Sequence, residues 1–545
     1  MIKKHKSFSS YICTSLCFVL LILHHKSTAQ SYSKSTKIFD LFEISIDIKK
    51  DKLIQSIEKP LQVSFTAPSG KITQVDAFWD GEFNWKIRFM PEELGQYKFY
   101  FLNQNKVKKY SFKSIKNNSK FAVYTKGKII HQKGNYHLSH HDGSPFFYLG
   151  CTAWNGALRS TDEEWDVYLE HRKTNNFNVI QFVTTDWRGF PMDYFDIKPY
   201  EIKDSILINP KYFQKLDEKF LQINQKGLIA APIILWAWTN PGNPGNDLSI
   251  KNAVKLAKYI KARYDAFHVL WNLAGDGDYL GKYEQRWKEI GKQVFGNTNE
   301  NQSLVTLHPR GFQWYAQAYN MENWINYFSY QTGHVNSSFT AKWKSNGPLA
   351  NQWNDLIPRP FIDTEPVYEH PGQNNNANEV RKSILQSLFS GPIAGTGYGA
   401  WTTWPWLRKN ETSINHGMTK PTAYDWKDGI ESTASKQLAH LYRFMNTLEW
   451  WKFRPLVKNF IVELEYEKDN PIFILSTENN EQLLVYFTSN GIFKIRNQHP
   501  NLKFQANWFN PSNAEIKSAE IKNTQRFIEV NRMELSDAIL HVKYY

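Results

Sequence analysis

The alternation of apolar and polar residues predicts short β-strands near both ends of the chain. From about Lys37 to Val123, apolar residues recur at every second position in runs such as LFEISIDI and QYKFYFL, which turn sequences separate. A period of two without a useful helical period is typical of a small antiparallel β-sandwich. Runs of the same kind return near the C-terminus in PIFILSTE, QLLVYFTS and DAILHVKYY, and they predict a second sandwich.

The central region has a different pattern, in which apolar runs alternate with amphipathic helical segments. Eight runs between Tyr136 and about Trp406 have the length of buried strands: residues 146–154, 177–185, 228–236, 268–275, 304–309, 327–334, 360–366 and 395–404. Alternating strands and helices favour a parallel sheet, and eight such strands close a TIM barrel. The predicted fold class is therefore multidomain, a (β/α)8 TIM barrel flanked by N-terminal and C-terminal antiparallel β-sandwiches.

Residues that favour helix starts support this count of strands. Ser160 followed by Glu163 resembles a capping box, while Asn209 with Pro210, and later Ser249, are expected to begin two further helices. The expected segments are a signal peptide at 1–29, an N-terminal sandwich at 30–125, the barrel at 126–440 and a C-terminal sandwich module at 441–545.

The first residues have the pattern of a cleavable secretion signal. Three lysines among the first six residues precede an apolar run from Tyr11 to Leu23, and Ser27 and Ala29 are small residues suited to cleavage. The apolar run is shorter than the ~20 residues of a membrane span, so no stable membrane insertion is expected. The sequence predicts a secreted or periplasmic protein.

Composition narrows the class of protein further. The chain has 545 residues, of which 41% are hydrophobic and 22% charged, as in a globular protein of several domains. Its formal net charge is +14, but the basic residues are dispersed among acids, so nucleic-acid binding is not expected. Cys151 lies alone in an apolar strand and is expected in the core, and the histidines lack metal-ligand spacing. We expect no metal and no cofactor, and the oligomeric state is left open.

Carboxylates at two strand ends carry the candidate chemistry. In TIM barrels the working residues follow the C-terminal ends of the strands, and Asp276 follows the fourth predicted strand while Glu365 follows the seventh. Cleavage of a glycosidic bond needs one carboxyl group to protonate the leaving oxygen and another to attack or stabilise the cationic sugar. Asp278 competes with Asp276, and Asp363 is expected to orient its neighbours rather than to react.

Aromatic and polar side chains at the other strand ends are candidates for substrate contact. Flat aromatic rings match the apolar C–H face of a sugar, and polar groups fix its hydroxyls. For His308, a packing role is a close alternative to substrate binding. The predicted substrate-binding residues are Trp154, Asp186, Trp238, His308, Tyr368 and Trp404.

Several motifs together resemble the apiosidase-like family of secreted glycoside hydrolases, in which a barrel precedes a module described as collagen-binding. They are YHLSHHDGSPFFYLGCTAW (136–154), LWNLAGDGD (270–278), FIDTEPVYE (361–369) and WFNP (508–511). The stretch from 77 to 101 is similar to the accessory sandwich found before such barrels. The resemblance implies that Asp276 is the general acid/base and Glu365 the nucleophile. The chain departs from the wider clan at Gly275-Asp276, where Asn-Glu is usual, and from the family at Cys151, where an acidic residue is common.

The resulting hypothesis is a secreted hydrolase of O-glycosidic bonds in plant or other polysaccharides, acting by a retaining double displacement. Retention predicts carboxyl groups about 5 to 5.5 Å apart, whereas ~6.5 to 9.5 Å would favour inversion. The alternative is a non-catalytic glycan-binding protein. The sugar, its linkage, and endo or exo action stay open.

Overall fold

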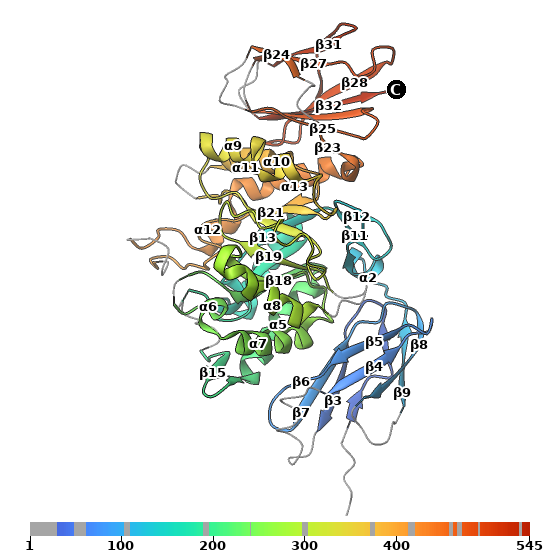
Figure 1. The fold of residues 1–545 in the computed structure, drawn as a ribbon, viewed down its shortest axis with the longest axis vertical. Coiled ribbons are helices and arrows are strands. Elements are labelled where there is room, and N and C mark those ends of the chain that lie inside the picture. The colour runs from blue at the N-terminus through green and yellow to red at the C-terminus, as the bar shows by residue number, and fades with distance from the viewer. Residues whose placement is uncertain are drawn as a thin grey trace, which may run out of the picture.

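A computed structural model describes residues 30–47, 61–102, 109–188, 196–239, 241–296, 303–370, 376–412, 420–456, 461–465, 471–488, 491–532 and 537–545. The predicted signal peptide at 1–29 lies outside the described residues. Figure 1 shows the N-terminal strands in blue at one end of the long axis, a mixed α/β region in the middle, and the C-terminal strands at the other end. Within the described part, no helix is both long and apolar enough to cross a membrane.

The central region is an eight-stranded parallel sheet with the order β19-β18-β17-β14-β13-β22-β21-β20. The two outermost strands also meet, because Asn326 N donates to Val305 O (2.9 Å) and Ser329 N donates to the Thr306 hydroxyl (3.1 Å). The sheet therefore curls into a barrel. Its strands are β13 (Tyr148–Thr152), β14 (Val179–Val183), β17 (Ile229–Trp236), β18 (Trp271–Gly277), β19 (Val305–Pro309), β20 (Phe328–Gln331), β21 (Phe361–Glu365) and β22 (Gly395–Thr396).

Seven of the eight runs that the sequence predicted contain one of these strands, and the run 268–275 overlaps β18, which continues to Gly277. The strands are apolar throughout because helices cover the outside and side chains fill the inside, so that every residue of β17, for example, is buried. Cys151 is a free, buried cysteine, as expected. The eighth run was predicted too long, since only Gly395 and Thr396 form a strand and residues 401–406 are turns.

The helices around the barrel begin mostly where the sequence predicted. The Asn209 side chain accepts from Lys211 N ahead of Pro210, and Ser249 accepts from Asn252 N. The predicted capping box was misplaced by one residue, because Thr161 caps the next helix with Glu164 while Ser160 N closes the preceding turn on Gly156 O. The main helices are α4 (Asp162–Thr174), α5 (Pro210–Gln225), α7 (Ile250–Tyr264), α8 (Glu284–Phe295), α9 (Ser338–Asn346), α11 (Ala377–Leu388) and α13 (Thr433–Met445).

Shorter elements connect these. They are α2 (Ala122–Thr125), β10 (Ile129–Ile130), β11 (Leu138–His140), β12 (Pro145–Phe146), α3 (Gly156–Arg159), β15 (Tyr200–Ile202), β16 (Ile206–Ile208), α6 (Pro244–Asp247), η2 (Gly281–Tyr283), α10 (Pro348–Gln352), α12 (Trp426–Ile430) and η3 (Trp450–Lys452). The first three strands of this set form a small antiparallel sheet.

The N-terminal region consists of two sheets, β1-β3-β7-β6 and β2-β9-β8-β4-β5, which share one core of aromatic and β-branched residues. All their pairings are antiparallel except β2 with β9. The strands are β1 (Gln30–Tyr32), β2 (Ser35–Lys37), β3 (Phe42–Asp47), β4 (Gln62–Thr66), β5 (Ile72–Asp76), β6 (Phe78–Trp79), β7 (Asn84–Phe89), β8 (Gly95–Phe101) and β9 (Tyr110–Ile115).

The C-terminal region also has two antiparallel sheets, β23-β25-β26-β32-β28-β29 and β24-β27-β31-β30, around a separate core. A buried ion pair between Arg381 of α11 and Asp537 (2.6 Å) joins this region to the barrel. The strands are β23 (Arg454–Pro455), β24 (Ile461–Glu465), β25 (Phe473–Ser476), β26 (Gln482–Phe487), β27 (Gly491–Arg496), β28 (Phe504–Phe509), β29 (Ile516–Ser518), β30 (Ile521–Asn523), β31 (Phe527–Arg532) and β32 (Ala538–Tyr544).

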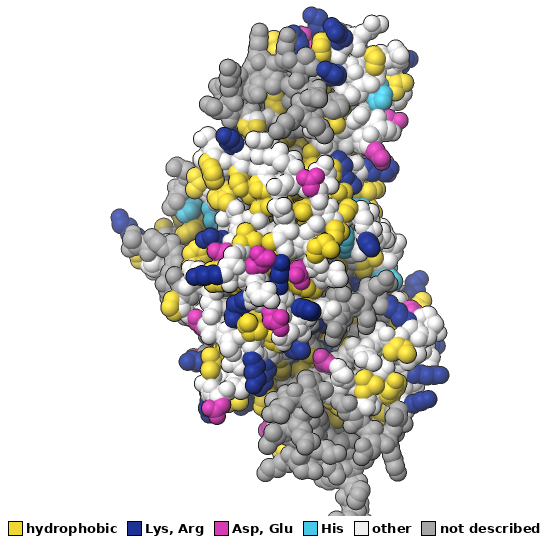
Figure 2. Space-filling view, viewed as in Figure 1, with side chains coloured by type: hydrophobic (Ala, Val, Ile, Leu, Met, Phe, Trp, Pro, Cys, Tyr) yellow, Lys and Arg dark blue, Asp and Glu magenta, His cyan; other side chains and the backbone are white. Residues whose placement is uncertain are grey.

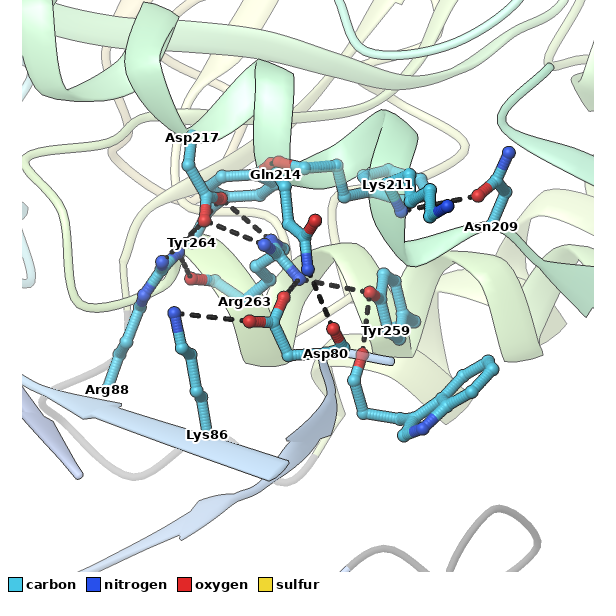
Figure 3. A network of polar contacts seen from close by, with 12 residues as sticks. Asp80, Lys86, Arg88, Asn209, Lys211, Gln214, Asp217, Tyr259, Arg263 and Tyr264 are labelled. Atoms are coloured by element: carbon cyan, nitrogen blue, oxygen red, sulfur yellow. Dashed lines mark hydrogen bonds and ion pairs between the residues drawn. The ribbon is translucent and has the colours of Figure 1, made fainter. Parts of the chain in front are cut away.

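A network of buried charges joins the N-terminal sheets to the barrel (Figure 3). Asp217 of α5 accepts from Arg88 of β7 at 3.0 and 2.6 Å and from Arg263 of α7 at 2.7 Å on each oxygen. Arg263 also pairs with Asp80 (2.8 Å), which in turn contacts Lys86 (3.1 Å). One carboxylate thus neutralises two guanidinium groups from different regions, and it fixes the N-terminal sheets against two barrel helices.

Candidate active site

A cavity of about 640 Å³ opens at the carboxyl ends of the barrel strands. Both predicted catalytic carboxylates, Asp276 and Glu365, line it. Its walls are mainly aromatic, which suits a ligand with flat apolar faces. The aromatic residues of the wall are Trp154, Trp187, Trp236, Trp238, Tyr368, Trp401 and Trp404.

Glu365 ends β21 and is held by donors on both of its oxygens. Oε2 accepts from His308 Nε2 at 2.6 Å and from Gln331 Nε2 at 2.5 Å, while Oε1 accepts from the Tyr368 hydroxyl and lies 3.4 Å from His334 Nε2. Four neighbours that point at one carboxylate leave it little freedom to rotate.

These donors also determine the charge of Glu365. Burial alone would raise its pKa, but hydrogen bonds from His308 and His334 outweigh burial and hold the pKa well below the ordinary value. Conversely, burial lowers the pKa of His334, but the adjacent Glu365 carboxylate reverses this and raises it. Glu365 is therefore an ionised carboxylate at neutral pH.

Asp276 lies at an irregular end of β18, where the pairing with β19 shifts register on both sides of Gly275. Its φ of 51° is in the left-handed region, which costs a non-glycine residue about 1 to 3 kcal/mol and is found most often at functional sites. The distortion brings the Asp276 side chain to the cavity. Asp278 is not part of the cavity lining; it contacts Gln313 (2.5 Å) and Arg310 (3.2 Å), of which Arg310 lines the cavity.

The partner of Asp276 is Arg188, which follows β14. Arg188 Nη2 lies 2.6 Å from Asp276 Oδ2, and its guanidinium stacks 4.3 Å from the Trp238 ring centre. Arg188 also has a positive φ of 53°, which its backbone N–H maintains by donating to Asn243 Oδ1 (2.7 Å). Burial raises the pKa of Asp276, Arg188 opposes this, Glu365 adds to it, and the net direction is upward.

Most predicted substrate-binding residues reach the cavity. Trp154, Trp238, Tyr368 and Trp404 line it, and Trp154 Nε1 donates to the Tyr368 hydroxyl at 2.8 Å. Tyr368 stacks on Trp404 and His334 with ring centres 5.7 and 4.3 Å apart. The aromatic wall is therefore continuous with the residues that hold Glu365.

The structure places the two other candidates, His308 and Asp186, away from the cavity lining. His308 is fully buried behind Glu365, and its second ring nitrogen lies 3.0 Å from the Thr364 hydroxyl. Both of its nitrogens already have protein partners, which favours the packing role that the sequence left open. Asp186 is directed to Tyr200, and burial raises its pKa while that hydrogen bond lowers it.

Asp363 has the orienting position that the sequence suggested. It is buried, accepts from the Thr332 hydroxyl at 2.6 Å, and accepts from Glu365 N at 3.3 Å. Beneath the site, the hydroxyls of Thr364 and Ser329 contact each other and His308. These buried contacts fix the end of β21 on which Glu365 stands.

The predicted site residues left out five polar side chains that line the cavity. They lie at the end of a barrel strand or in the segment after it, and that position was the available signal: Arg188, Arg310, Gln331, His334 and His370. Among the described residues, no group of three or more His, Cys, Asp or Glu side chains could hold a metal ion.

Comparison with known families identifies the barrel. A family described as "Apiosidase-like, catalytic domain" matches residues 132–452, and a domain of unknown function (DUF5060) matches residues 36–102. No curated protein matches the chain.

Solved structures share the fold at low sequence identity. A structure described as a glycoside hydrolase has 20% identity, covers 78% of this chain and 98% of its own, and has a TM-score of 0.64. A glycoside hydrolase family 5 protein from Bacteroides vulgatus has 20% identity, with coverage of 79% and 95% and a TM-score of 0.63. Another Bacteroides vulgatus protein, provisionally named a glycoside hydrolase, has 18% identity, with coverage of 94% and 100% and a TM-score of 0.70.

The family match covers more than half of the chain and includes β13 to β22, with both cavity carboxylates. The chain therefore belongs to the apiosidase-like family, and it is a glycoside hydrolase.

Proposed function

We propose that the protein is a secreted enzyme that hydrolyses O-glycosidic bonds of plant or other polysaccharides by a retaining double displacement. Asp276 is the general acid/base and Glu365 the nucleophile. The observation that carries this proposal is the opposite direction of their pKa values in one cavity, where burial raises that of Asp276 while histidine hydrogen bonds lower that of Glu365. Such a pair separates the proton donor from the ionised carboxylate.

The mechanism has two steps. First, a Glu365 oxygen forms a bond to the anomeric carbon as the bond from that carbon to the leaving oxygen breaks. The leaving oxygen takes the proton of Asp276. In the second step, Asp276 takes a proton from water, the water oxygen bonds to the anomeric carbon, and Glu365 leaves. Arg188, 2.6 Å from Asp276, stabilises the carboxylate that exists between the two steps.

The rival function, glycan binding without hydrolysis, is less well supported. It would fit a Glu365 that was buried against a permanent cation or turned away from Asp276. Instead, Glu365 contacts two histidines, a glutamine and a tyrosine, and both carboxylates line the same cavity. The neighbouring aromatic wall suits a sugar in either case.

The proposal extends to the rest of the chain. Secretion rests on the signal-like residues 1–29, and the description of 30–125 and 441–545 as sandwich modules rests on the paired sheets around separate cores. The boundaries at 125 and 440 stay predictions. The family resemblance makes apiose in plant pectin the first candidate sugar.

Incubation of the mature protein with a panel of plant and marine oligosaccharides tests the function. We expect release of a sugar by the wild type, and Glu365→Gln should abolish release while sugar binding is retained. Proton NMR of the first product should show the anomer of the substrate, since retention is proposed. Release of the opposite anomer would reject the nucleophilic role of Glu365, and no release from any glycan would reject the proposed activity.

A further inference from the structure

An aromatic cluster lies just outside the cavity, on the segments that follow β19 and β20. Phe312 comes three residues after β19, and Phe339 and Trp343 are on α9. Phe339 is 60% exposed, and Val335 nearby in sequence is 64% exposed. Figure 2 shows hydrophobic side chains gathered over the part of the surface where Figure 1 places α9 and α10. We call Phe312, Phe339 and Trp343 the aromatic ledge.

The aromatic ledge is continuous with the cavity wall. Gly311 and Gly333 both line the cavity, and the Phe312 ring lies directly on Gly333, where an added Cβ would be 2.6 Å from its Cζ. Phe312 contacts Phe339 and Trp343 edge-on, with ring centres 5.2 and 5.7 Å apart. A ligand that leaves the cavity past the two glycines therefore meets these rings next.

The position of Phe312 is fixed by the site itself. Its φ of 61° is unusual for a bulky residue, and its N–H donates to Gln331 O at 2.9 Å. The side chain of Gln331 is a donor to Glu365 Oε2. A strained backbone thus holds an aromatic ring beside Gln331, which is itself a hydrogen-bond partner of Glu365.

We propose that the aromatic ledge is a carbohydrate subsite, which binds sugar units of the substrate chain beyond the one held between Asp276 and Glu365. A sugar ring stacks its apolar C–H face on an aromatic side chain, and a mostly exposed phenylalanine beside a glycosidase cavity is suited to this contact. The inference rests on the proposed function, because the occupant is the remainder of the same substrate. It implies a substrate of several sugar units rather than a monosaccharide glycoside.

Affinity gel electrophoresis tests the subsite in the Glu365→Gln background, which prevents hydrolysis. The probes are pectin, xylan, galactomannan and laminarin, each cast separately into a native gel. We expect at least one polysaccharide to slow the parent, and Phe339→Ala to weaken that binding about 5-fold to 10-fold, the size of one aromatic contact. Phe339→Tyr should retain binding, since it keeps the ring.

Met321→Ala is the matched control, because Met321 is 77% exposed and lies at the opposite end of the barrel from the cavity. Its neighbour Asn320 accepts a hydrogen bond from Ile357 N, ahead of the start of β21. It should bind like the parent. Three results would overturn the subsite. They are equal binding by Phe339→Ala and the parent, equal losses of binding in Phe339→Ala and Met321→Ala, and no retardation of the parent by any polysaccharide. A change from dimer to monomer in Phe339→Ala by light scattering would also overturn it, since the face would then be an interface between copies of this chain.

Hydrolysis by the wild type, measured on the same four polysaccharides, separates this proposal from the proposed function. Release of sugar with no effect of Phe339→Ala on binding rejects the subsite and leaves the enzyme assignment standing. Weaker binding by Phe339→Ala without any release by the wild type supports the subsite and rejects the proposed hydrolysis of these chains.

Discussion

Asp217 is the carboxylate that Arg88 and Arg263 share where the N-terminal sheets meet the barrel (Figure 3). We predict that Asp217→Asn weakens this junction. Asparagine keeps the shape of the side chain and one acceptor oxygen but removes the charge. The two guanidinium groups then stay close together without a shared counter-charge, and breaking a buried pair in this way is strongly destabilising.

The pKa of Asp217 gives the size of the expected loss of stability. Burial alone would raise it, but Arg88 and Arg263 lower the pKa from 3.8 to about 2. Since one pKa unit corresponds to about 1.4 kcal/mol, the charge of Asp217 stabilises the folded state by about 2 kcal/mol. The folded-state pKa is below the unfolded one, so this contribution is fully present above the unfolded value of 3.8 and is lost as the pH falls toward 2.

Amide hydrogen exchange of β7 and α7 measures the opening of the two elements that carry the arginines. At pH 7, Asp217→Asn should lower protection there about 30-fold, and near pH 3 the difference from wild type should shrink to about half in free energy. Glu170→Gln, at an exposed ion pair of α4 with Lys226, is the control and should change protection less than about 2-fold. Unchanged protection in Asp217→Asn at pH 7, or an undiminished difference near pH 3, would refute the reasoning.

Two further predictions concern the reaction. Asp276→Asn should lower kcat by about 10²-fold to 10⁴-fold because the proton donor is lost, whereas Asp278→Asn, which is not part of the cavity lining, should leave kcat within about 3-fold. Steady-state kinetics on the cleaved glycan measure both effects. Equal losses in the two variants would contradict the assignment of Asp276 as the acid/base. His334→Gln removes one of the contacts that depress the pKa of Glu365. The acid limb of the kcat/KM profile should therefore move to higher pH, and an unmoved limb would show that Glu365 does not set it.

Much of the barrel could be predicted because its strands are buried on both faces. Such strands read as continuous apolar runs, and their neighbouring helices begin at residues with a clear capping chemistry, such as Asn209 and Ser249. The prediction failed where a competing contact decided the local structure. Ser160 already closes α3, so the cap moved to Thr161, and the eighth strand shortened where the chain turns to form the cavity wall.

The same limit applies to the site. The ends of the strands indicate candidate residues, but the direction in which a side chain points there depends on β-bulges and on contacts with residues far away in sequence. His308 lies near the carboxyl end of β19, yet its ring nitrogens contact Glu365 and Thr364. Arg188 and Asp276 pair at a place where both residues adopt positive φ values, and no pattern of residue types predicts that.

By itself, the sequence determined the three-region organisation, the number and order of barrel strands, and the strand ends that bear Asp276 and Glu365. Hydrophobic periodicity and helix-capping residues are local properties, so the sequence alone is enough to recognise them. Only the tertiary structure decided which of Asp276 and Asp278 faces the cavity, which side chains hold Glu365, and that the aromatic ledge continues the cavity wall. These depend on contacts between residues far apart in sequence, such as Trp154 and Tyr368, which are 214 positions apart, and on the irregular backbone at the strand ends.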